Sequence, residues 1–478
     1  MGYMPYLKTN IADTNRAFRI ALGDLAGNII PFKDGLLKEE KEVIIAGMDY
    51  VTPWTRDAAI NTWNGAGLLY PEVTKNTLLS VIEERDGMKR VGGEYWDAII
   101  WTLGAWWQYL FTGDTQFLKL AHEAAGNSLR FFEETEFTQQ LNLFRGAACY
   151  GDGVSAYPEI YVTKKKNPGI KSWATANPEQ AARRGEGFPA HVVSTNCLYY
   201  LAYEIMGSME KELGLPENPD WAKKAENLKN AINKVLWNET AGRYDYFVDP
   251  FGGCDYQEGL GQSFAILFGV ADREQAESIF RNIHIEPVGI PCVWPTFPRY
   301  RTQDGSGFGR HSGTVWPHVQ GFWAQAAAMY GKKKLFGSEL ARLAGLASRD
   351  SFFAEVYHPV TGAIYGGLQE AEEAGIIEWK SSVRQTWSAT AFIRMIFFGL
   401  IGMEFGTDGI CFYPVIPEEY HEVCLTGLKY RNMVMDIEIR GNGSVIREFK
   451  VNGAGRAVHK LSGEETGSVK VEIVISDI

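Results

Sequence analysis

The strongest constraint on the fold is a series of about twelve helical segments in which two kinds of helix alternate. Some segments, such as 96–112 and 385–403, are apolar on almost every side and must be buried all round. Others, such as 218–237, have one apolar stripe opposite a polar face and therefore cover a core. This alternation predicts two concentric rings of helices, a mainly α (α/α)6 toroid. The predicted helices are 10–26, 57–68, 71–86, 96–112, 114–135, 189–213, 218–237, 256–270, 272–284, 314–331, 332–354 and 385–403.

The lengths of the links between helices indicate where a site lies. Links that follow a buried helix are short, as at 113–114, whereas links that precede one are long, as at 136–188 and 355–384. The link 87–95 is an exception. Long loops in a compact domain usually carry function. We therefore expect the site at the end of the toroid where the buried helices begin.

The pattern changes from helical to alternating after Gly406. Residues 433–440 and 444–451 alternate apolar and polar side chains around a turn at 441–443, which is typical of a β-hairpin. All of the 14 tryptophans lie at or before Trp387. We predict two domains, an (α/α)6 toroid over residues 1–404 and a small β-sandwich over residues 405–478.

Composition excludes several classes of protein. Lys and Arg total 47 against 58 Asp and Glu, and a net charge of −11 argues against nucleic acid or an anionic membrane as partner. The six cysteines are scattered, which fits neither a zinc ribbon nor a disulfide framework. No signal peptide is visible, and the most apolar stretch, 391–405, is interrupted by Arg394. We expect a soluble, cytoplasmic protein without metal or cofactor.

Polar and aromatic residues gather where the buried helices begin. Aromatic rings cover the C–H faces of sugars while fixed polar groups bind the hydroxyls, so this mixture predicts a carbohydrate site. The alternative for Asp57 is a helix N-cap, and the histidines are more often structural than catalytic. The candidate substrate-binding residues are Trp54, Arg56, Asp57, Trp96, Asp97, Tyr157, His191, Gln257, Glu258, His311, Trp316, His318, Gln385 and Trp387.

Glycoside hydrolysis needs two carboxyl groups on opposite sides of the scissile bond. Asp152 and Glu370 lie in two long links separated by six helices, which face each other in a ring of twelve. The alternatives are an ordinary Gly-Asp-Gly turn for Asp152 and a solvated acidic face for Glu370. Asp97 and Glu258 remain alternative acids.

Five motifs resemble the six-hairpin glycosidases, with the clan of processing α-glucosidase I and the mannosylglycerate-hydrolase-like enzymes as the nearest match. The motifs are Trp54–Ala59, Tyr95–Asp97, Ser194–Asn196, Gly313–Pro317 and Gln385–Ala389. The resemblance implies that Asp152 is the general acid and Glu370 the base, and that the Trp54, Arg56 and Asp57 element contacts the terminal sugar. Residues 425–431 look like the β-domain of related sugar phosphorylases and rhamnosidases.

We therefore expect an exo-acting glycoside hydrolase that cleaves an α-linked terminal sugar of an oligosaccharide or glycoside with inversion. Inversion predicts carboxyl groups roughly 6.5–9.5 Å apart. One alternative is a sugar phosphorylase in which Arg310, His311 and Thr314 hold phosphate. Others are a sugar epimerase or polysaccharide lyase that uses a histidine base, and a carbohydrate-binding protein without catalysis. The sequence leaves the oligomeric state open.

Overall fold

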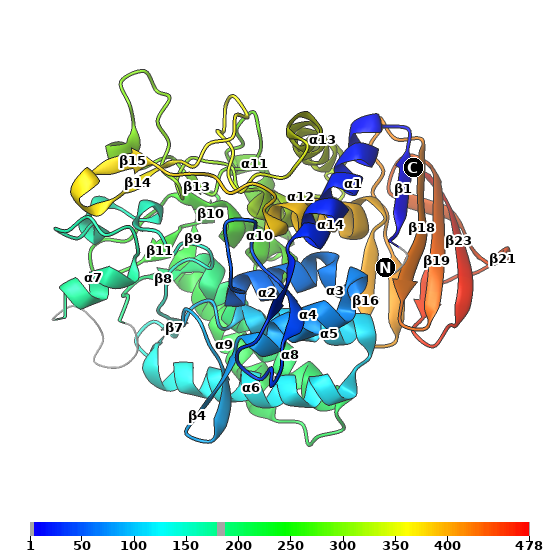
Figure 1. Ribbon diagram of the computed structural model, residues 1–478, viewed down its shortest axis with the longest axis horizontal. Coiled ribbons are helices and arrows are strands. Elements are labelled where there is room, and N and C mark those ends of the chain that lie inside the picture. The colour runs from blue at the N-terminus through cyan, green and yellow to red at the C-terminus, as the bar shows by residue number, and fades with distance from the viewer. Residues whose placement is uncertain (1–3, 179–186, 478) are drawn as a thin grey trace.

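The computed structural model describes residues 4–178 and 187–477, and within these ranges six inner and six outer helices make up the helical domain (Figure 1). Each inner helix contacts the next, and the last contacts the first, so the inner ring is closed and the predicted helical toroid is confirmed. The inner helices are α2 (Thr55–Asn61), α5 (Ile100–Thr112), α8 (Val193–Glu212), α10 (Gly259–Leu267), α12 (Pro317–Met329) and α14 (Thr386–Arg394). The outer helices are α1 (Ala12–Gly27), α4 (Pro71–Ser80), α6 (Thr115–Thr135), α9 (Pro219–Leu236), α11 (Arg273–Asn282) and α13 (Lys333–Asp350).

Small residues let the inner helices approach closely. A Cβ at Gly104 of α5 would lie 2.5 Å from Cα of Ala59 in α2, and one at Gly321 of α12 would lie 2.8 Å from Cβ of Ala391 in α14. Two of the inner helices continue as π-helical turns, Thr62–Ala66 after α2 and Met395–Leu400 after α14, and α3 (Gly67–Leu69) follows the first. The ring is therefore packed backbone against backbone along its axis.

The predicted helix 71–86 is wrong in its last turn. Helix α4 ends at Ser80, and β4 (Ile82–Arg85) pairs with β5 (Met88–Val91) as a hairpin. The turn residues Asp86 and Gly87 both have positive φ, 52° and 72°, the type I′ geometry that an Asp-Gly pair favours. The link before α5 therefore runs from 81 to 99, and the exception among the long links disappears.

The C-terminal region consists of two sheets that pack together, with Phe412 and Phe449 in ring contact at 5.6 Å. The larger sheet has the order β1 (Tyr6–Thr9), β18 (Glu422–Tyr430), β19 (Met433–Gly441), β23 (Gly467–Ser476), β20 (Val445–Val451) and β21 (Ala454–Gly455). The smaller sheet has the order β16 (Met403–Gly406), β17 (Gly409–Phe412) and β22 (Lys460–Ser462). Alternating side chains of β19 and β23 face the buried side, as the sequence pattern requires.

Two expectations about this region need correction. Strand β1 pairs with β18, so the first residues of the chain belong to the C-terminal sheet and not to the helical domain that was expected over 1–404. Strands β19 and β20 do not form a hairpin, because β23 lies between them and runs parallel to β19. The turn at Gly443 pairs instead with Ile416, which carries β20 away from β19.

The long links lie at the end of the toroid opposite the six-stranded sheet (Figure 1). They contain short strand pairs and helix α7 (Lys171–Ala176). The hairpin of β14 (Leu368–Glu370) and β15 (Ile376–Glu378) also lies at this end (Figure 1). The remaining strands are β2 (Ile29–Phe32), β3 (Lys41–Ile44), β6 (Phe137–Thr138), β7 (Leu143–Phe144), β8 (His191–Val192), β9 (Trp237–Asn238), β10 (Arg243–Tyr244), β11 (Phe247–Val248), β12 (Gln257–Glu258) and β13 (Val293–Trp294). Among the helices of the described ranges, none has the length and apolar character needed to cross a bilayer.

Candidate active site

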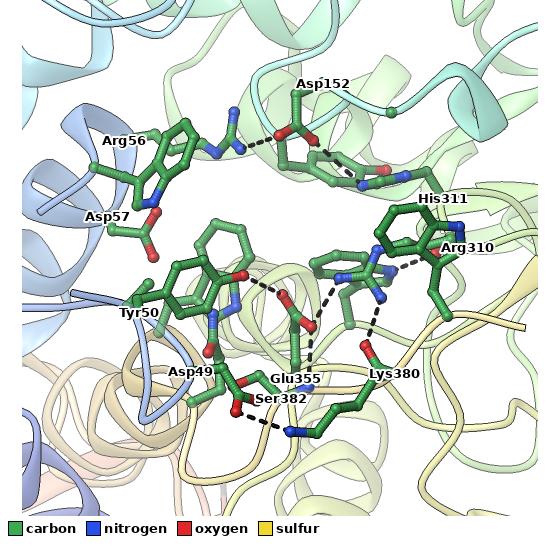
Figure 2. A pocket seen from close by; sticks show the side chains of 18 of the residues that line it. Asp49, Tyr50, Arg56, Asp57, Asp152, Arg310, His311, Glu355, Lys380 and Ser382 are labelled. Atoms are coloured by element: carbon green, nitrogen blue, oxygen red, sulfur yellow. Dashed lines mark hydrogen bonds and ion pairs between the residues drawn. The ribbon is translucent and has the colours of Figure 1, made fainter. Parts of the chain in front are cut away.

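A cavity of about 550 Å³ opens at the loop end of the toroid. Eight of the residues expected from the sequence line it, which agrees with the location deduced from the long links. These eight are Trp54, Arg56, Asp57, Asp152, His311, Trp316, Gln385 and Trp387. Figure 2 shows charged side chains pointing into this space from several directions.

Asp152 enters the cavity from the link between α6 and α8. Its loop is fixed by Tyr157, whose hydroxyl donates to Gly151 O at 2.7 Å and accepts from Ala148 N at 2.9 Å. The Asp152 side chain is 36% exposed and accepts a bond from Arg56 Nη2 at 2.7 Å. Burial raises the pKa of Asp152, but the positive charge of the Arg56 guanidinium and its hydrogen bond to Asp152 outweigh this effect and hold that pKa below its usual range.

Glu355 faces Asp152 from the opposite side of the cavity (Figure 2). Its Oε2 accepts from Arg310 Nη2 at 2.8 Å and from Ser382 N at 3.1 Å, and its Oε1 accepts from the Tyr50 hydroxyl at 3.3 Å. Burial and the neighbouring Glu355 raise the pKa of Tyr50 well above its usual value, so the phenol keeps its proton and donates. Three donors therefore hold the Glu355 carboxyl group in a fixed position in the cavity.

Asp57 supplies a third carboxyl group, at the start of α2. It is buried, and burial raises its pKa to about 7 against the attraction of Arg56, with Glu355 and Asp152 raising it further. Near neutral pH this group is therefore part protonated, and it can donate a hydrogen bond to a ligand hydroxyl as well as accept one.

Aromatic rings form the walls of the cavity. The Trp316 ring stacks on His311 with centroids 4.9 Å apart, and its Nε1 donates to Arg310 O at 2.7 Å. Trp387 stacks on His318 at 4.2 Å, so His318 supports the wall from behind. Trp54 lies at the rim and is 39% exposed. Flat apolar walls beside fixed charges suit a sugar ring.

Glu370, the base expected from the sequence, lies outside the cavity. Its carboxylate pairs with Arg299 Nε at 2.8 Å and accepts from the Tyr300 hydroxyl. Neighbouring residues of a strand point to opposite faces, and in β14 it is Gln369 that lines the cavity. The structure therefore brings Glu355, and not Glu370, to face Asp152.

Seven other candidates from the sequence also lie outside the cavity. Trp96 is buried against Tyr95, and Asp97 is buried in an ion pair of 2.6 Å with Arg56. His191 bonds Thr138 Oγ1 at 2.9 Å, and Gln257 bonds the backbone of His284. Glu258 accepts from Ser194 N at 3.2 Å deep in the ring, and Tyr157 and His318 act as described above. Their contacts make them supports of the site and not parts of its surface.

Several cavity residues escaped sequence reasoning. Helix α13 ends at Asp350, whereas the predicted helix ended at residue 354. Glu355 therefore stood directly after the predicted helix and was not recognised as a site residue. Lys380 and Asp49 form a 2.8 Å ion pair at the rim (Figure 2). Among the residues that were missed are Asp49, Tyr50, Glu355, Gln369, Trp379, Lys380 and Ser382. They come from two long links, whose length was the one signal that pointed to them.

A helical toroid with a cavity lined by carboxyl groups and walled by aromatic rings has the groups that glycoside hydrolysis requires. Residues 53–388 match the family described as the mannosylglycerate hydrolase MGH1-like glycoside hydrolase domain. The chain therefore belongs to the MGH1-like glycoside hydrolase family. No curated protein sequence matches the chain.

Solved structures of low sequence identity share the fold. A sialidase superimposes with a TM-score of 0.65 at 15% identity, over 95% of this chain and 40% of that one. A GH78 rhamnosidase of a Bacillus species superimposes with a TM-score of 0.62 at 13% sequence identity, over 99% of this chain and 44% of that one. The GH63 mannosylglycerate hydrolase of Thermus thermophilus superimposes with a TM-score of 0.58 at 15% sequence identity, over 80% of this chain and 99% of that one. The chain thus spans less than half of the first two proteins and nearly all of the third.

Proposed function

We propose that this glycosidase is exo-acting and removes an α-linked terminal sugar with inversion, with Asp152 as general acid and Glu355 as general base. The observation that carries the proposal is the opposition of these two carboxyl groups across one cavity (Figure 2). An inverting enzyme needs this arrangement, because water must attack the face of the sugar opposite the leaving group.

In the proposed reaction Asp152 gives its proton to the glycosidic oxygen while Glu355 takes a proton from water. The water oxygen bonds to the anomeric carbon as the bond to the leaving oxygen breaks, and the carbon inverts. Arg310 and Ser382 N support the base role, since they hold the Glu355 carboxyl group in place in the cavity. The arginine is engaged by Glu355 and by Gly366 O at 3.0 Å, which disfavours the phosphorylase alternative in which it binds phosphate.

The cavity supports a small substrate. About 550 Å³ holds one sugar ring and a compact leaving group, with Asp57, Arg56 and Trp54 placed to bind the terminal ring. The solved GH63 mannosylglycerate hydrolase is described in complex with glucose, and with Tris and D-glycerate. We therefore propose an α-hexoside of a small hydroxy acid or polyol as the substrate class.

The test is hydrolysis of mannosylglycerate, glucosylglycerate and a panel of α- and β-nitrophenyl hexosides, with and without phosphate. Wild type should release sugar independently of phosphate, and proton NMR of the first product should show the β-anomer. Asp152→Asn and Glu355→Gln should each slow release by at least about 100-fold, whereas Glu370→Gln should retain most of it. Full activity in either of the first two variants, or an α-anomer as first product, would contradict the proposal.

A further inference from the structure

A chain of hydrogen bonds leads from the β14 hairpin to the proposed acid. Ser155 Oγ donates to Gln369 Oε1 at 2.8 Å and lies 2.9 Å from His311 Nδ1. The same hydroxyl accepts from the His311 backbone N at 3.2 Å. On the other side of the imidazole, Nε2 lies 3.6 Å from Asp152 Oδ1 (Figure 2).

This chain fixes the tautomer of His311. A serine hydroxyl has one proton, and Ser155 gives it to the amide oxygen of Gln369. Toward His311 the hydroxyl is then an acceptor, so Nδ1 must carry the ring proton. In a neutral imidazole the second nitrogen is an acceptor. His311 therefore presents the lone pair of Nε2 to Asp152.

The surroundings keep the imidazole neutral. Burial lowers the pKa of His311 to about 3, and the cations Arg310 and Arg56 add to this effect, against the attraction of Asp152 and a hydrogen bond to Gln369. Above this pH His311 carries no charge that would hold Asp152 ionised. A carboxylate oxygen and a lone pair then face each other, which fits a separation of 3.6 Å, longer than a hydrogen bond.

We propose that His311 is a positioning residue that accepts a hydrogen bond from protonated Asp152 and so keeps the proton on the acid until the glycosidic bond breaks. The proposal rests on the proposed function, in which Asp152 is the general acid. The proton remains bonded to Asp152 Oδ1 while Nε2 accepts a hydrogen bond from it. In the reaction the proton passes from Asp152 to the leaving oxygen. His311 is neutral before and after the step.

The other charges around Asp152 make such a partner necessary. Arg56 pairs with Asp152 directly, and Arg310 also lowers the pKa of that carboxyl. Asp57 and Glu355 lie across the cavity and oppose a further negative charge. Two cations favour the ionised form, and an acceptor at Nε2 is the contact that favours the protonated form needed for catalysis.

The Gly-Asp-Gly sequence fits the same arrangement. A Cβ at Gly153 would lie 2.2 Å from Gln369 Oε1 and 2.7 Å from His311 Nδ1. Glycine at this position therefore lets the histidine and the amide approach the backbone next to Asp152. The neighbouring Glu370 holds β14 through Arg299, which places Gln369.

The first experiment needs no activity. ¹⁵N NMR of histidine-labelled protein at pH 7 should show the His311 Nδ1 as protonated and Nε2 as unprotonated. The signal that disappears in His311→Phe, which keeps a ring against Trp316, is assigned to His311. If His311→Phe does not fold, the signal that shifts in Ser155→Ala gives the assignment. A proton on Nε2, or on both nitrogens, would overturn the proposal.

The second experiment follows the acid itself. In Ser155→Ala the ring loses the acceptor at Nδ1 and gains the tautomer that donates from Nε2, so Asp152 should titrate about one pH unit lower in ¹³C carboxyl NMR. The alkaline limb of kcat/KM should move in the same direction, with KM little changed. An unchanged or higher midpoint for Asp152 would overturn the proposal.

Controls separate this proposal from the proposed function. His421→Gln, at an exposed histidine of the C-terminal region, should move neither the Asp152 titration nor the activity. If Asp152→Asn keeps full activity, the acid assignment fails while the two NMR measurements still report on the His311 contact. If Asp152→Asn is inactive and the Asp152 midpoint does not fall in Ser155→Ala, the His311 proposal alone fails.

Discussion

The carboxylates of Asp97 and Asp152 are joined by one guanidinium. Arg56 donates to Asp97 Oδ2 at 2.6 Å and to Asp152 Oδ2 at 2.7 Å. Asp97 is buried beneath the cavity, whereas the Asp152 side chain is 36% exposed. The buried carboxylate thus anchors the arginine that holds the exposed one, so Asp97 contributes to the site without lining it.

Removing Arg56 should destabilise the protein. In Arg56→Ala the buried Asp97 loses the arginine that pairs with it, and breaking a buried ion pair from one side costs about 3–5 kcal/mol. The free energy of unfolding, measured with urea at pH 7, should fall by this amount. The double variant Arg56→Ala/Asp97→Asn should recover part of the loss, since the uncompensated charge is gone. Equal stability of the single and double variants would show that Asp97 does not depend on Arg56.

Glu355 and Glu370 should respond differently to the same change. Glu355→Gln should lower kcat about 10²–10⁴-fold with little change in KM, the usual effect of losing a general base. Glu370→Gln removes the nearer of two anionic partners of Arg299, the other being Glu159 at 3.6 Å, and should lower stability by about 1–3 kcal/mol while most of kcat remains. Steady-state kinetics and urea unfolding on both variants check this. A kcat loss in Glu370→Gln as large as that in Glu355→Gln would return the base role to Glu370.

The helical part of the fold could be predicted because its signal is local. The spacing of apolar residues along each helix shows whether the helix is buried on all sides or on one side. The alternation of these two kinds of helix predicts the ring. The pairing of β1 with β18 joins Tyr6 to Thr426, and no local pattern at residues 6–9 reveals a partner so distant. The Asp86-Gly87 turn is a local signal from which the hairpin could have been predicted. The hairpin was missed because the helical period of residues 71–80 was extended over the turn.

The site could be predicted where helix starts define it, and less well where links do. Arg56 and Asp57 follow directly from the start of α2, whereas the choice between Gln369 and Glu370 depends on the register of a three-residue strand. A shift of one residue in a strand exchanges the side chain that faces the cavity. Glu355 depends in the same way on α13 ending at Asp350.

Gly153 should not tolerate a methyl group. In Gly153→Ala the new Cβ would lie 2.2 Å from Gln369 Oε1 and 2.6 Å from His311 Cε1, so one of these side chains has to move. We expect a loss of about 1–3 kcal/mol in stability and at least a tenfold loss of kcat/KM. Thermal unfolding and kinetics measure the two effects.

The matched control is Gly23→Ala in helix α1, where a Cβ meets nothing within 4 Å. Alanine is the better helix former by about 1 kcal/mol, so this variant should be slightly more stable and fully active. If both substitutions behave alike, the close approach at Gly153 is not what holds the site.

Glu258 lies in a buried position that sets a pH dependence of stability. Burial raises its pKa from 4.5 to about 8, and hydrogen bonds from Ser194 lower it only in part. The folded protein therefore keeps this proton up to about pH 8, whereas the unfolded chain loses it near 4.5. The contribution of Glu258 to the free energy of unfolding is fully present below pH 4.5 and is lost as the pH rises toward 8.

Replacing Glu258 with glutamine should remove that loss, because the amide resembles the protonated acid and cannot ionise. Between pH 5 and 8 the free energy of unfolding of Glu258→Gln should exceed that of wild type by a margin that grows about 1.4 kcal/mol per pH unit. Urea unfolding at several pH values measures the margin. The exposed Glu226→Gln on α9 should stay within about 0.5 kcal/mol of wild type throughout. Parallel curves for wild type and Glu258→Gln would mean that Glu258 ionises in the folded protein as it does in the unfolded chain, with a cation or water reaching it in the ring.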